Sequence, residues 1–278
     1  MNRRIRIFQV DAFTTERFTG NPAGVVLDAD ALTKAEKQRI AADVGFAETA
    51  FVSHSDIATF KLEFFTPNRQ IAHCGHATIA TFSLLRAQGR VGAGTLSKET
   101  IDGTRAIIVD GDRVFMEQRA PKIEDVALDA LGVGDATHGT VVDTGNRFLM
   151  IEAPSADALA AIAPDQALIA DVSERLDLIG YYVYARESRK PGRIATARMF
   201  APRYGIDEEA GTGMAAGPLA ALLHLRHGAG ERVLIEQGAL MPVPSPSVIE
   251  VRLDVADGAI RGLMAGGRAT VMGSRRVG

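Results

Sequence analysis

Two stretches of the chain each join a turn rich in small residues to a long apolar run. They span residues 64–85 and 199–223, and in both a Phe-containing segment leads through a glycine turn into an Ala- and Leu-rich segment of helical length. A helix with so few charged side chains has no polar face to turn toward water. The pattern therefore predicts two buried helices, one in each half of the chain.

Shorter apolar or alternating runs, bounded by turn residues, predict strands in the first half. These runs are residues 5–13, 18–27, 49–53, 95–98, 105–109 and 114–118. A surface helix is expected at residues 33–44, because Thr33 and Glu36 have the spacing of a capping box and Gly45 can end the helix.

The second half has the same kinds of run. Strands are expected at residues 148–153, 178–184, 233–237 and 249–253. A helix is expected at 155–162, and a short helix within 121–135, where Ile123, Val126 and Leu131 are apolar.

The order of these runs indicates a duplication. Thr144, Gly145 and Asn146 match residues 19–21, and each triplet precedes an apolar strand and, later, a glycine turn with its helix. We therefore expect an α/β (α+β) protein of two duplicated halves, residues 1–120 and 121–267, with a cleft between them. Each half would be a curved, mostly antiparallel sheet or barrel around its apolar helix, and the C-terminal strand at 268–278 is a candidate to complete the first half.

The composition argues against a nucleic acid or a membrane as a partner of this protein. The formal net charge is −3 and the basic residues are scattered, so no nucleic-acid surface is indicated. No run approaches the roughly 18 apolar residues that a membrane helix needs. A single cysteine, Cys74, excludes an intrachain disulfide, and a cytoplasmic protein is the simplest interpretation.

The two glycine turns are candidate anion sites. A helix N-terminus carries unsatisfied N–H groups and a partial positive charge, and glycine lets a carboxylate approach them closely. Gly75 in the first half, with Gly211 and Gly213 in the second, could thus hold a small carboxylic acid. Tight turning alone would also explain one such glycine.

Cys74 begins the first turn, where its thiol could serve as a base or nucleophile. Epimerases without a cofactor use two such thiols, one per half, but the matching position in the second turn is Ala210 and the chain has no other cysteine. A two-thiol racemase is therefore excluded, and Cys74 is expected to line the pocket.

Two other kinds of site are weaker hypotheses. The pairs His73/His76 and His224/His227 lack the spacing and companions of a metal site, so no metal is expected. The residues Gly211, Gly213 and Ala216 fit a dinucleotide fingerprint, with Glu236 further on. However, three carboxylates at 207–209 precede that turn and would repel a pyrophosphate.

Four motifs occur in an order that resembles the PhzF family of phenazine-biosynthesis-like isomerases, relatives of diaminopimelate epimerase and proline racemase. They are residues 10–26, 45–52, 64–81 and 197–218. The resemblance covers nearly the whole chain. It implies a diaminopimelate epimerase-like fold, a reaction without a cofactor and a homodimer.

The resemblance also assigns roles to residues. The family's catalytic glutamate falls on Glu48 and its Gly-His pair on Gly75 and His76, while its second catalytic acid, an aspartate, is here Glu209. A substrate-binding serine is replaced by Met214, which cannot donate a hydrogen bond from its side chain. The expected substrate-binding residues are Asn21, Cys74, Gly75, Gly211, Thr212, Gly213 and Met214.

These residues predict an isomerase in which Glu48 removes a proton next to the carboxylic acid of a small unsaturated or hydroxy acid and returns it elsewhere. His76 and Glu209 would polarise the substrate or carry the proton. The family substrate, trans-2,3-dihydro-3-hydroxyanthranilate, is less firmly indicated than the reaction because of Met214. The open alternatives are an epimerase of another small acid and a binding protein that has lost the chemistry.

Overall fold

A computed structural model describes residues 4–17, 19–188 and 190–277, so Phe18 of the predicted strand 18–27 lies outside the described chain. The chain divides into two compact units. Unit 1 comprises Met1–Glu117 and Gly266–Gly278, and unit 2 comprises Gln118–Ala265. No helix in the described ranges has the length and apolar character to cross a membrane.

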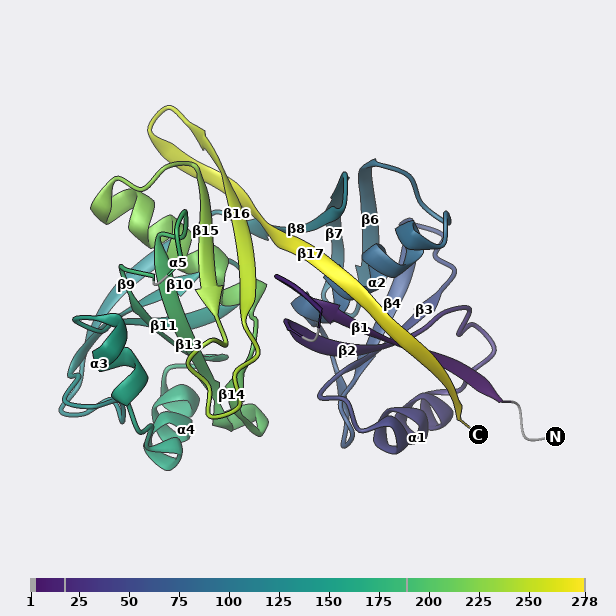
Figure 1. Ribbon diagram of the computed structural model, residues 1–278, viewed down its shortest axis with the longest axis horizontal. Coiled ribbons are helices and arrows are strands. Elements are labelled where there is room, and N and C mark those ends of the chain that lie inside the picture. The colour runs from purple at the N-terminus through teal and green to yellow at the C-terminus, as the bar shows by residue number, and fades with distance from the viewer. Residues whose placement is uncertain (1–3, 18, 189, 278) are drawn as a thin grey trace. The chain divides into compact units, whose positions relative to one another are not determined.

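Unit 1 is built on strands that pair in a fixed order (Figure 1). β1 is antiparallel to β2, β2 is parallel to β3, β3 is antiparallel to β4, β4 is parallel to β6 and β6 is antiparallel to β7. The short β5 pairs with β4. The bounds are β1 Ile5–Ala12, β2 Asn21–Val26, β3 Thr49–Ser53, β4 Phe60–Phe65, β5 Gln70–Ile71, β6 Gly94–Thr100, β7 Gly103–Asp110 and β8 Arg113–Arg119.

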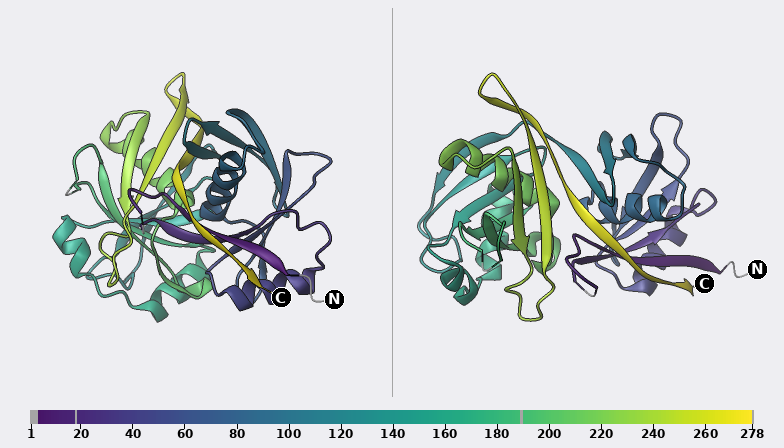
Figure 2. Two further views of the ribbon diagram at one scale, coloured as in Figure 1. Left: turned by 45° about the vertical axis from the view of Figure 1, so that its right-hand side comes forward. Right: turned by 45° about the horizontal axis from the view of Figure 1, so that its top comes forward.

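A C-terminal strand, β17 (Ala259–Val277), closes this set into a ring. β7 is antiparallel to β8, β8 pairs with β17, and β17 is antiparallel to β1 from Ile5↔Val277 to Ala12↔Ala269. Eight strands thus form a closed barrel-like ring, in which residues from both ends of the chain are neighbours (Figure 2).

Unit 2 repeats the order of pairings. β10 is antiparallel to β11, β11 is parallel to β12, β12 is antiparallel to β13, β13 is parallel to β15 and β15 is antiparallel to β16. The short β14 pairs with β13 as β5 does with β4. This repetition is what the duplication predicted from the sequence requires. The bounds are β9 Lys122–Ala127, β10 His138–Asp143, β11 Arg147–Glu152, β12 Gly180–Ala185, β13 Ala195–Ala201, β14 Ile206–Glu209, β15 Arg232–Gln237 and β16 Ser247–Ala256.

One apolar helix in each unit is buried, as predicted. α2 (Gly75–Ala87) packs on β1, β2 and β3, and every residue from Gly75 to Leu85 is buried. α5 (Gly213–His227) packs on β10, β11, β15 and β16. Because these helices have strands around them, they need no polar face.

Other helices cover the strands with one apolar face. α1 (Lys34–Val44) begins at the predicted capping box and ends at Gly45, whose φ of 71° is the left-handed cap that glycine tolerates. Its Ile40 and Val44 pack on Phe51 and Phe65. In unit 2, α3 (Ala156–Ala161) and α4 (Gln166–Arg175) cover Tyr181, Val183 and Phe200 in the same manner.

Three elements differ from the sequence prediction. The short helix expected within 121–135 is wrong, because residues Lys122–Ala127 form β9, an exposed strand paired with β10. The helix α4 was not predicted, although Asp165 caps it by accepting a hydrogen bond from the Leu168 amide. β17 begins nine residues before the C-terminal strand expected at 268–278.

Candidate active site

Glu48, Cys74 and His76 lie together in unit 1. Glu48 ends the loop before β3, and its carbonyl accepts a hydrogen bond from the Gly24 amide on β2 at 3.0 Å. Cys74 is the N-cap of α2 and His76 is in its first turn. All three side chains are buried, with exposed fractions of 4% to 5%. The turn at Gly75 and the end of the loop before β3 thus lie side by side.

The imidazole of His76 lies between the other two groups. Its Nε2 is 3.3 Å from Oε2 of Glu48, and its Nδ1 is 3.6 Å from Sγ of Cys74. Oε2 of Glu48 accepts no hydrogen bond of good geometry from the described residues. A buried carboxylate oxygen whose neighbour is not a well-aligned donor is costly as a purely structural feature, and it is typical of a group that acts on a ligand.

Burial raises the pKa of the Cys74 thiol, the positive charge of His76 lowers it, and the negative charge of Glu48 raises it. The net direction is upward, so the thiol is protonated at neutral pH. The N-terminus of α2, with Gly75 as its first residue and no acidic side chain in its first turn, favours negative charge at the same place.

The ligand atoms of these three residues lie within 4.8 Å of one another. The imidazole of His76 meets Glu48 through Nε2 and Cys74 through Nδ1, so it can accept a proton on one side of the ring and release one on the other.

The second predicted turn lies in unit 2, at the N-terminus of α5. Thr212 is the N-cap, and its hydroxyl donates a short hydrogen bond to the Glu209 carboxylate. The side chain of Gln237 fixes this turn with two hydrogen bonds. It donates to the Glu209 carbonyl at 2.7 Å and accepts from the Thr212 amide at 2.9 Å. Counted from the first residue of each helix, the position that matches Cys74 is Thr212 rather than Ala210, and neither is a cysteine.

Other contacts hold the first residues of α5. Gln118 donates to the Gly213 carbonyl at 2.8 Å and accepts from the Thr144 hydroxyl at 2.9 Å. Met214 is half-buried, and its sulfur accepts a long contact of 3.6 Å from Asn146. Asn146 is the second-half match of Asn21, which is buried at the start of β2. That Asn21, Gly211 and the Glu209–Met214 turn bind the substrate stays a prediction.

The residues considered for a dinucleotide site and for a metal site make other contacts in the structure. Glu236 accepts a hydrogen bond from Ser188 at 3.1 Å and lies 3.8 Å from Arg193. The strand directly before the glycine turn is the short antiparallel β14 rather than a long parallel strand. Nδ1 of His224 lies 2.6 Å from the Ala229 carbonyl oxygen beyond the end of α5.

Sequence reasoning missed Lys98. This lysine on β6 is fully buried, with Nζ 2.8 Å from the Thr78 hydroxyl, 3.1 Å from Nδ1 of His73 and 5.1 Å from the centre of the Phe64 ring. None of these partners is a carboxylate. Burial lowers the pKa of Lys98 to about 7; Cys74 and Asp102 oppose this shift, whereas the positive charge of Arg105 adds to it.

We expect this buried amine to make stability depend on pH. Between pH 7 and 9 the unfolded chain holds a proton on Lys98, whose ordinary pKa is 10.5, while the folded chain has largely lost it. Because the unfolded state binds more protons, the free energy of unfolding should rise with pH, by up to about 1.4 kcal/mol per pH unit. Lys98→Met should remove this component in urea titrations at several pH values.

Lys37→Met is the control for that measurement, since Lys37 is also buried but forms an ion pair with Glu63. The contribution of Lys98 is the difference in slope between the wild type and Lys98→Met. Parallel stability curves for these two proteins would contradict a neutral buried amine.

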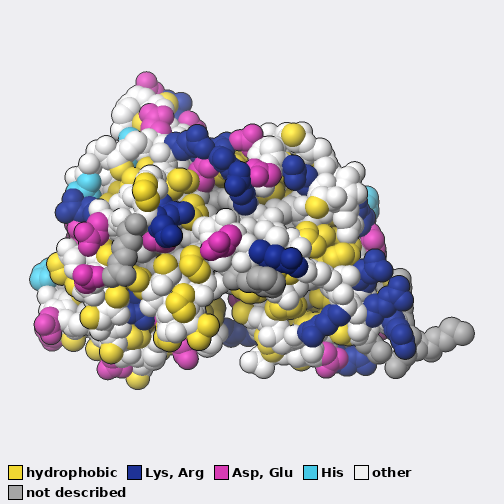
Figure 3. Space-filling model, in the orientation of Figure 1, with side chains coloured by type: hydrophobic (Ala, Val, Ile, Leu, Met, Phe, Trp, Pro, Cys, Tyr) yellow, Lys and Arg dark blue, Asp and Glu magenta, His cyan; other side chains and the backbone are white. Residues whose placement is uncertain are grey.

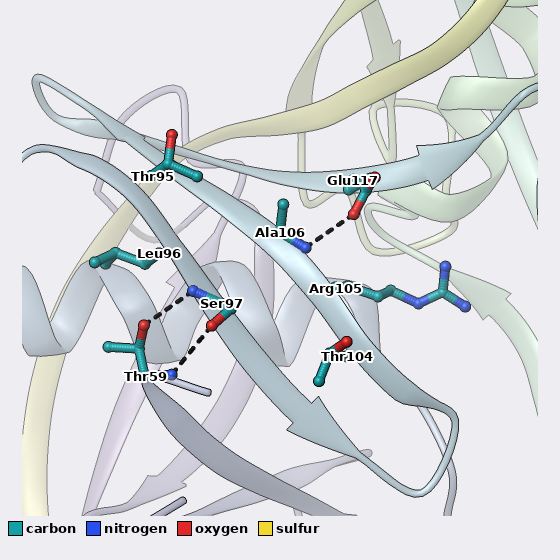
Figure 4. A pocket seen from close by; sticks show the side chains of 8 residues that line it. All are labelled: Thr59, Thr95, Leu96, Ser97, Thr104, Arg105, Ala106 and Glu117. Atoms are coloured by element: carbon teal, nitrogen blue, oxygen red, sulfur yellow. Dashed lines mark hydrogen bonds between the residues drawn. The ribbon is translucent and has the colours of Figure 1, made fainter. Parts of the chain in front are cut away.

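One hollow on the surface is lined by residues other than Glu48, Cys74 and His76. In unit 1 a hollow of about 350 Å³ is lined by the hydroxyls of Thr59, Thr95, Ser97 and Thr104 (Figure 4). Arg105 extends away from the other side chains drawn there. Basic and acidic side chains both occur over each unit on the face shown in Figure 3. The chemistry of Glu48, Cys74 and His76, not the size of a hollow, therefore marks the candidate site.

Comparison with known proteins places the chain in a family. Residues 10–274 match the family described as phenazine biosynthesis-like protein. The chain belongs to this family, the PhzF family. The resemblance found in the sequence is thereby confirmed.

Relatives and solved structures agree on the class of enzyme. An uncharacterized isomerase of Clostridium acetobutylicum is 35% identical over 80% of both chains. The trans-2,3-dihydro-3-hydroxyanthranilate isomerase of Pseudomonas fluorescens is 33% identical over 85% of this chain and 86% of its own. A PhzF-family crystal structure from Bacillus anthracis superposes with a TM-score of 0.87 at 27% identity, over 99% of both chains. The protein is thus a PhzF-family isomerase with the mixed α/β fold of that family.

Proposed function

We propose that the protein isomerises a small unsaturated or hydroxy carboxylic acid without a cofactor, with Glu48 as the base that removes a proton and returns it at another carbon. The observation that carries the proposal is the buried pair of Glu48 and His76, with Oε2 3.3 Å from Nε2. Family membership supports the reaction class, and the resemblance supports the role of the glutamate.

The physical basis is the environment of the carboxylate. A proton next to a conjugated acid is weakly acidic, so its removal needs a base that is positioned and shielded from water. A general base of this kind is typically worth about 10²- to 10⁴-fold in rate. His76 can stabilise the carboxylate or receive its proton, and amides at the start of α2 can hold the substrate's carboxylate.

The substrate is proposed as a class. The relative from Pseudomonas fluorescens acts on trans-2,3-dihydro-3-hydroxyanthranilate, which is a cyclic unsaturated hydroxy acid and therefore the first compound to test. The Met214 side chain offers sulfur where a hydroxyl is usual in the family, which favours a less polar group at that position if the second turn binds substrate. The roles of Glu209 and of a homodimer stay predictions.

Deuterium exchange tests the proposal. Wild-type protein in D₂O should exchange the acidic proton of trans-2,3-dihydro-3-hydroxyanthranilate, or of related small acids, and form the isomer. Glu48→Gln should lose both by about 10²-fold or more, because the amide cannot take up a proton. The control is Glu63→Gln, which changes another carboxylate of unit 1, one that pairs with Lys37. Equal exchange by the wild type and Glu48→Gln would show that Glu48 is not the base.

A further inference from the structure

A buried amine connects the two ends of the turn that carries Gly75 and His76. Nζ of Lys98, on β6, donates a hydrogen bond to the Thr78 hydroxyl at 2.8 Å and lies 3.1 Å from Nδ1 of His73. His73 precedes the N-cap of α2, and Thr78 lies in the helix beyond His76. One side chain from a different element therefore contacts the chain on both sides of residues 74–77.

The contact continues into the backbone of the turn. The Thr78 hydroxyl donates to the Cys74 carbonyl at 2.6 Å, and the Thr78 amide donates to the same carbonyl at 3.3 Å. Because the hydroxyl proton points to Cys74, the Thr78 oxygen is free to accept from Lys98. The amine, the hydroxyl and the carbonyl thus form a continuous chain of hydrogen bonds that ends one residue before Gly75.

Packing alone does not account for a lysine at this position. Lys98 has no exposed surface, and a lysine is almost never fully buried without a charged partner. Lys37, which is also buried, has such a partner in Glu63. A methionine of similar length would fill the space without the cost of burying an amine. With its pKa lowered to about 7, the amine of Lys98 is neutral at higher pH, and its two N–H groups and one lone pair suffice for Thr78 and His73.

We infer that Lys98 is a positioning residue of the isomerisation, whose amine keeps the turn at residues 73–78 in the arrangement that the reaction needs. This inference rests on the proposed function. The turn carries the amides at the start of α2, which the proposed function assigns to the substrate's carboxylate, and the imidazole of His76. A shift of about 1 Å in groups of this kind can cost about 10²-fold in rate. Lys98 acts through the backbone of the turn and does not touch the reacting atoms.

Substitutions at both ends of the hydrogen bond test the inference, with trans-2,3-dihydro-3-hydroxyanthranilate as the probe. Lys98→Met and Thr78→Val should each lower kcat/KM by about 10- to 10²-fold. The double variant should be at most a few-fold slower than the slower single variant, because both interrupt one chain of hydrogen bonds. Thr78→Ser keeps the hydroxyl and should stay within a few-fold of the wild type.

Stability separates positioning from a merely structural role. At pH 7 Lys98→Met should unfold at a urea concentration at or above that of the wild type, because methionine removes a buried amine. The rate should therefore fall although the fold is no weaker. A loss of rate in Thr78→Ser as large as in Thr78→Val, or rates of Lys98→Met equal to those of the wild type, would overturn the inference.

Thr81→Val is the matched control. Thr81 is also buried in α2, and its hydroxyl donates to the Ala77 carbonyl at 2.7 Å, but no side chain in the described part of the chain donates to it. Its substitution should leave kcat/KM within a few-fold of the wild type, and a loss equal to that of Thr78→Val would contradict a special role of the amine. Undiminished exchange in Glu48→Gln would instead remove the proposed function on which the inference rests.

A second measurement needs no substrate. In Lys98→Met the amides of residues 75–78 should exchange with D₂O about 10-fold faster than in the wild type, because the turn has lost its support from β6. Mass spectrometry of the corresponding peptide measures this rate. Lys37→Met, which changes a buried lysine of another element, should leave it unchanged. Unchanged exchange in Lys98→Met would show that the amine does not hold the turn, whatever is found for Glu48.

Discussion

Replacing Gly266 by alanine is expected to destabilise the protein by about 3 kcal/mol, because β17 and β8 approach too closely there for any side chain. A Cβ on Gly266 would overlap the Val114 carbonyl oxygen and lie 2.6 Å from the Cα of Phe115. Both obstacles are backbone atoms of β8, so no side-chain rotation can relieve the clash. The strands would have to separate at the contact that closes the ring of unit 1.

Gly273 offers a matched control in the same strand. It is exposed, pairs with Gln9 on β1, and a Cβ there would meet no atom within 4 Å. Gly273→Ala should therefore change the free energy of unfolding by no more than about 0.5 kcal/mol. Urea unfolding followed by circular dichroism measures both variants, since the chain has no tryptophan. Equal stability of the two variants would show that β8 and β17 are not tightly packed at Gly266.

Elements whose ends carry local signals could be predicted from the sequence. The capping box at Thr33 and the glycine at position 45 define α1 within one residue, and the strand at Thr49–Ser53 matches β3. The apolar character of α2 and α5 sufficed to predict their burial. In each case the interactions that determine the element are within a few residues of it.

Elements that depend on distant pairing could not be predicted in this way. The sequence of β9, KIEDVA, is polar and largely exposed, and it is extended because β10 pairs with it from His138 to Asp143. The full length of β17 likewise follows from its partners, among them β1 at the other end of the chain. For α4 a local signal did exist, since Asp165 precedes an amphipathic run, and it was overlooked.

In the candidate site, too, some features have a local sequence signal and others depend on contacts between distant parts of the chain. Glu48 and His76 were assigned through the family motifs, and Glu48 alone resembles an ordinary charge at the edge of a strand. Their convergence depends on β2 holding the loop before β3 beside the first turn of α2. Lys98 could not have been found, because an alternating strand does not reveal that its lysine meets Thr78 and His73 of another element.

Glu48→Gln and His76→Asn are expected to be strongly non-additive. Each alone should lower kcat/KM by about 10²- to 10⁴-fold, since each interrupts the same transfer of a proton. Oε2 of Glu48 and Nε2 of His76 are 3.3 Å apart, so replacing either residue removes the interaction between them, and replacing the second removes little more. The double variant should therefore be no more than a few-fold slower than the slower single variant.

His54 provides the control for this cycle. Its imidazole is exposed and lies 3.2 Å from Asp56, whereas Glu48 and His76 are buried, so His54→Asn combined with Glu48→Gln should show no coupling. Steady-state rates with an acid that the wild type isomerises measure all the variants. If the losses of Glu48→Gln and His76→Asn multiplied in full, the two residues would serve separate steps. In that case His76 could polarise the substrate but would not be the group that exchanges a proton with Glu48.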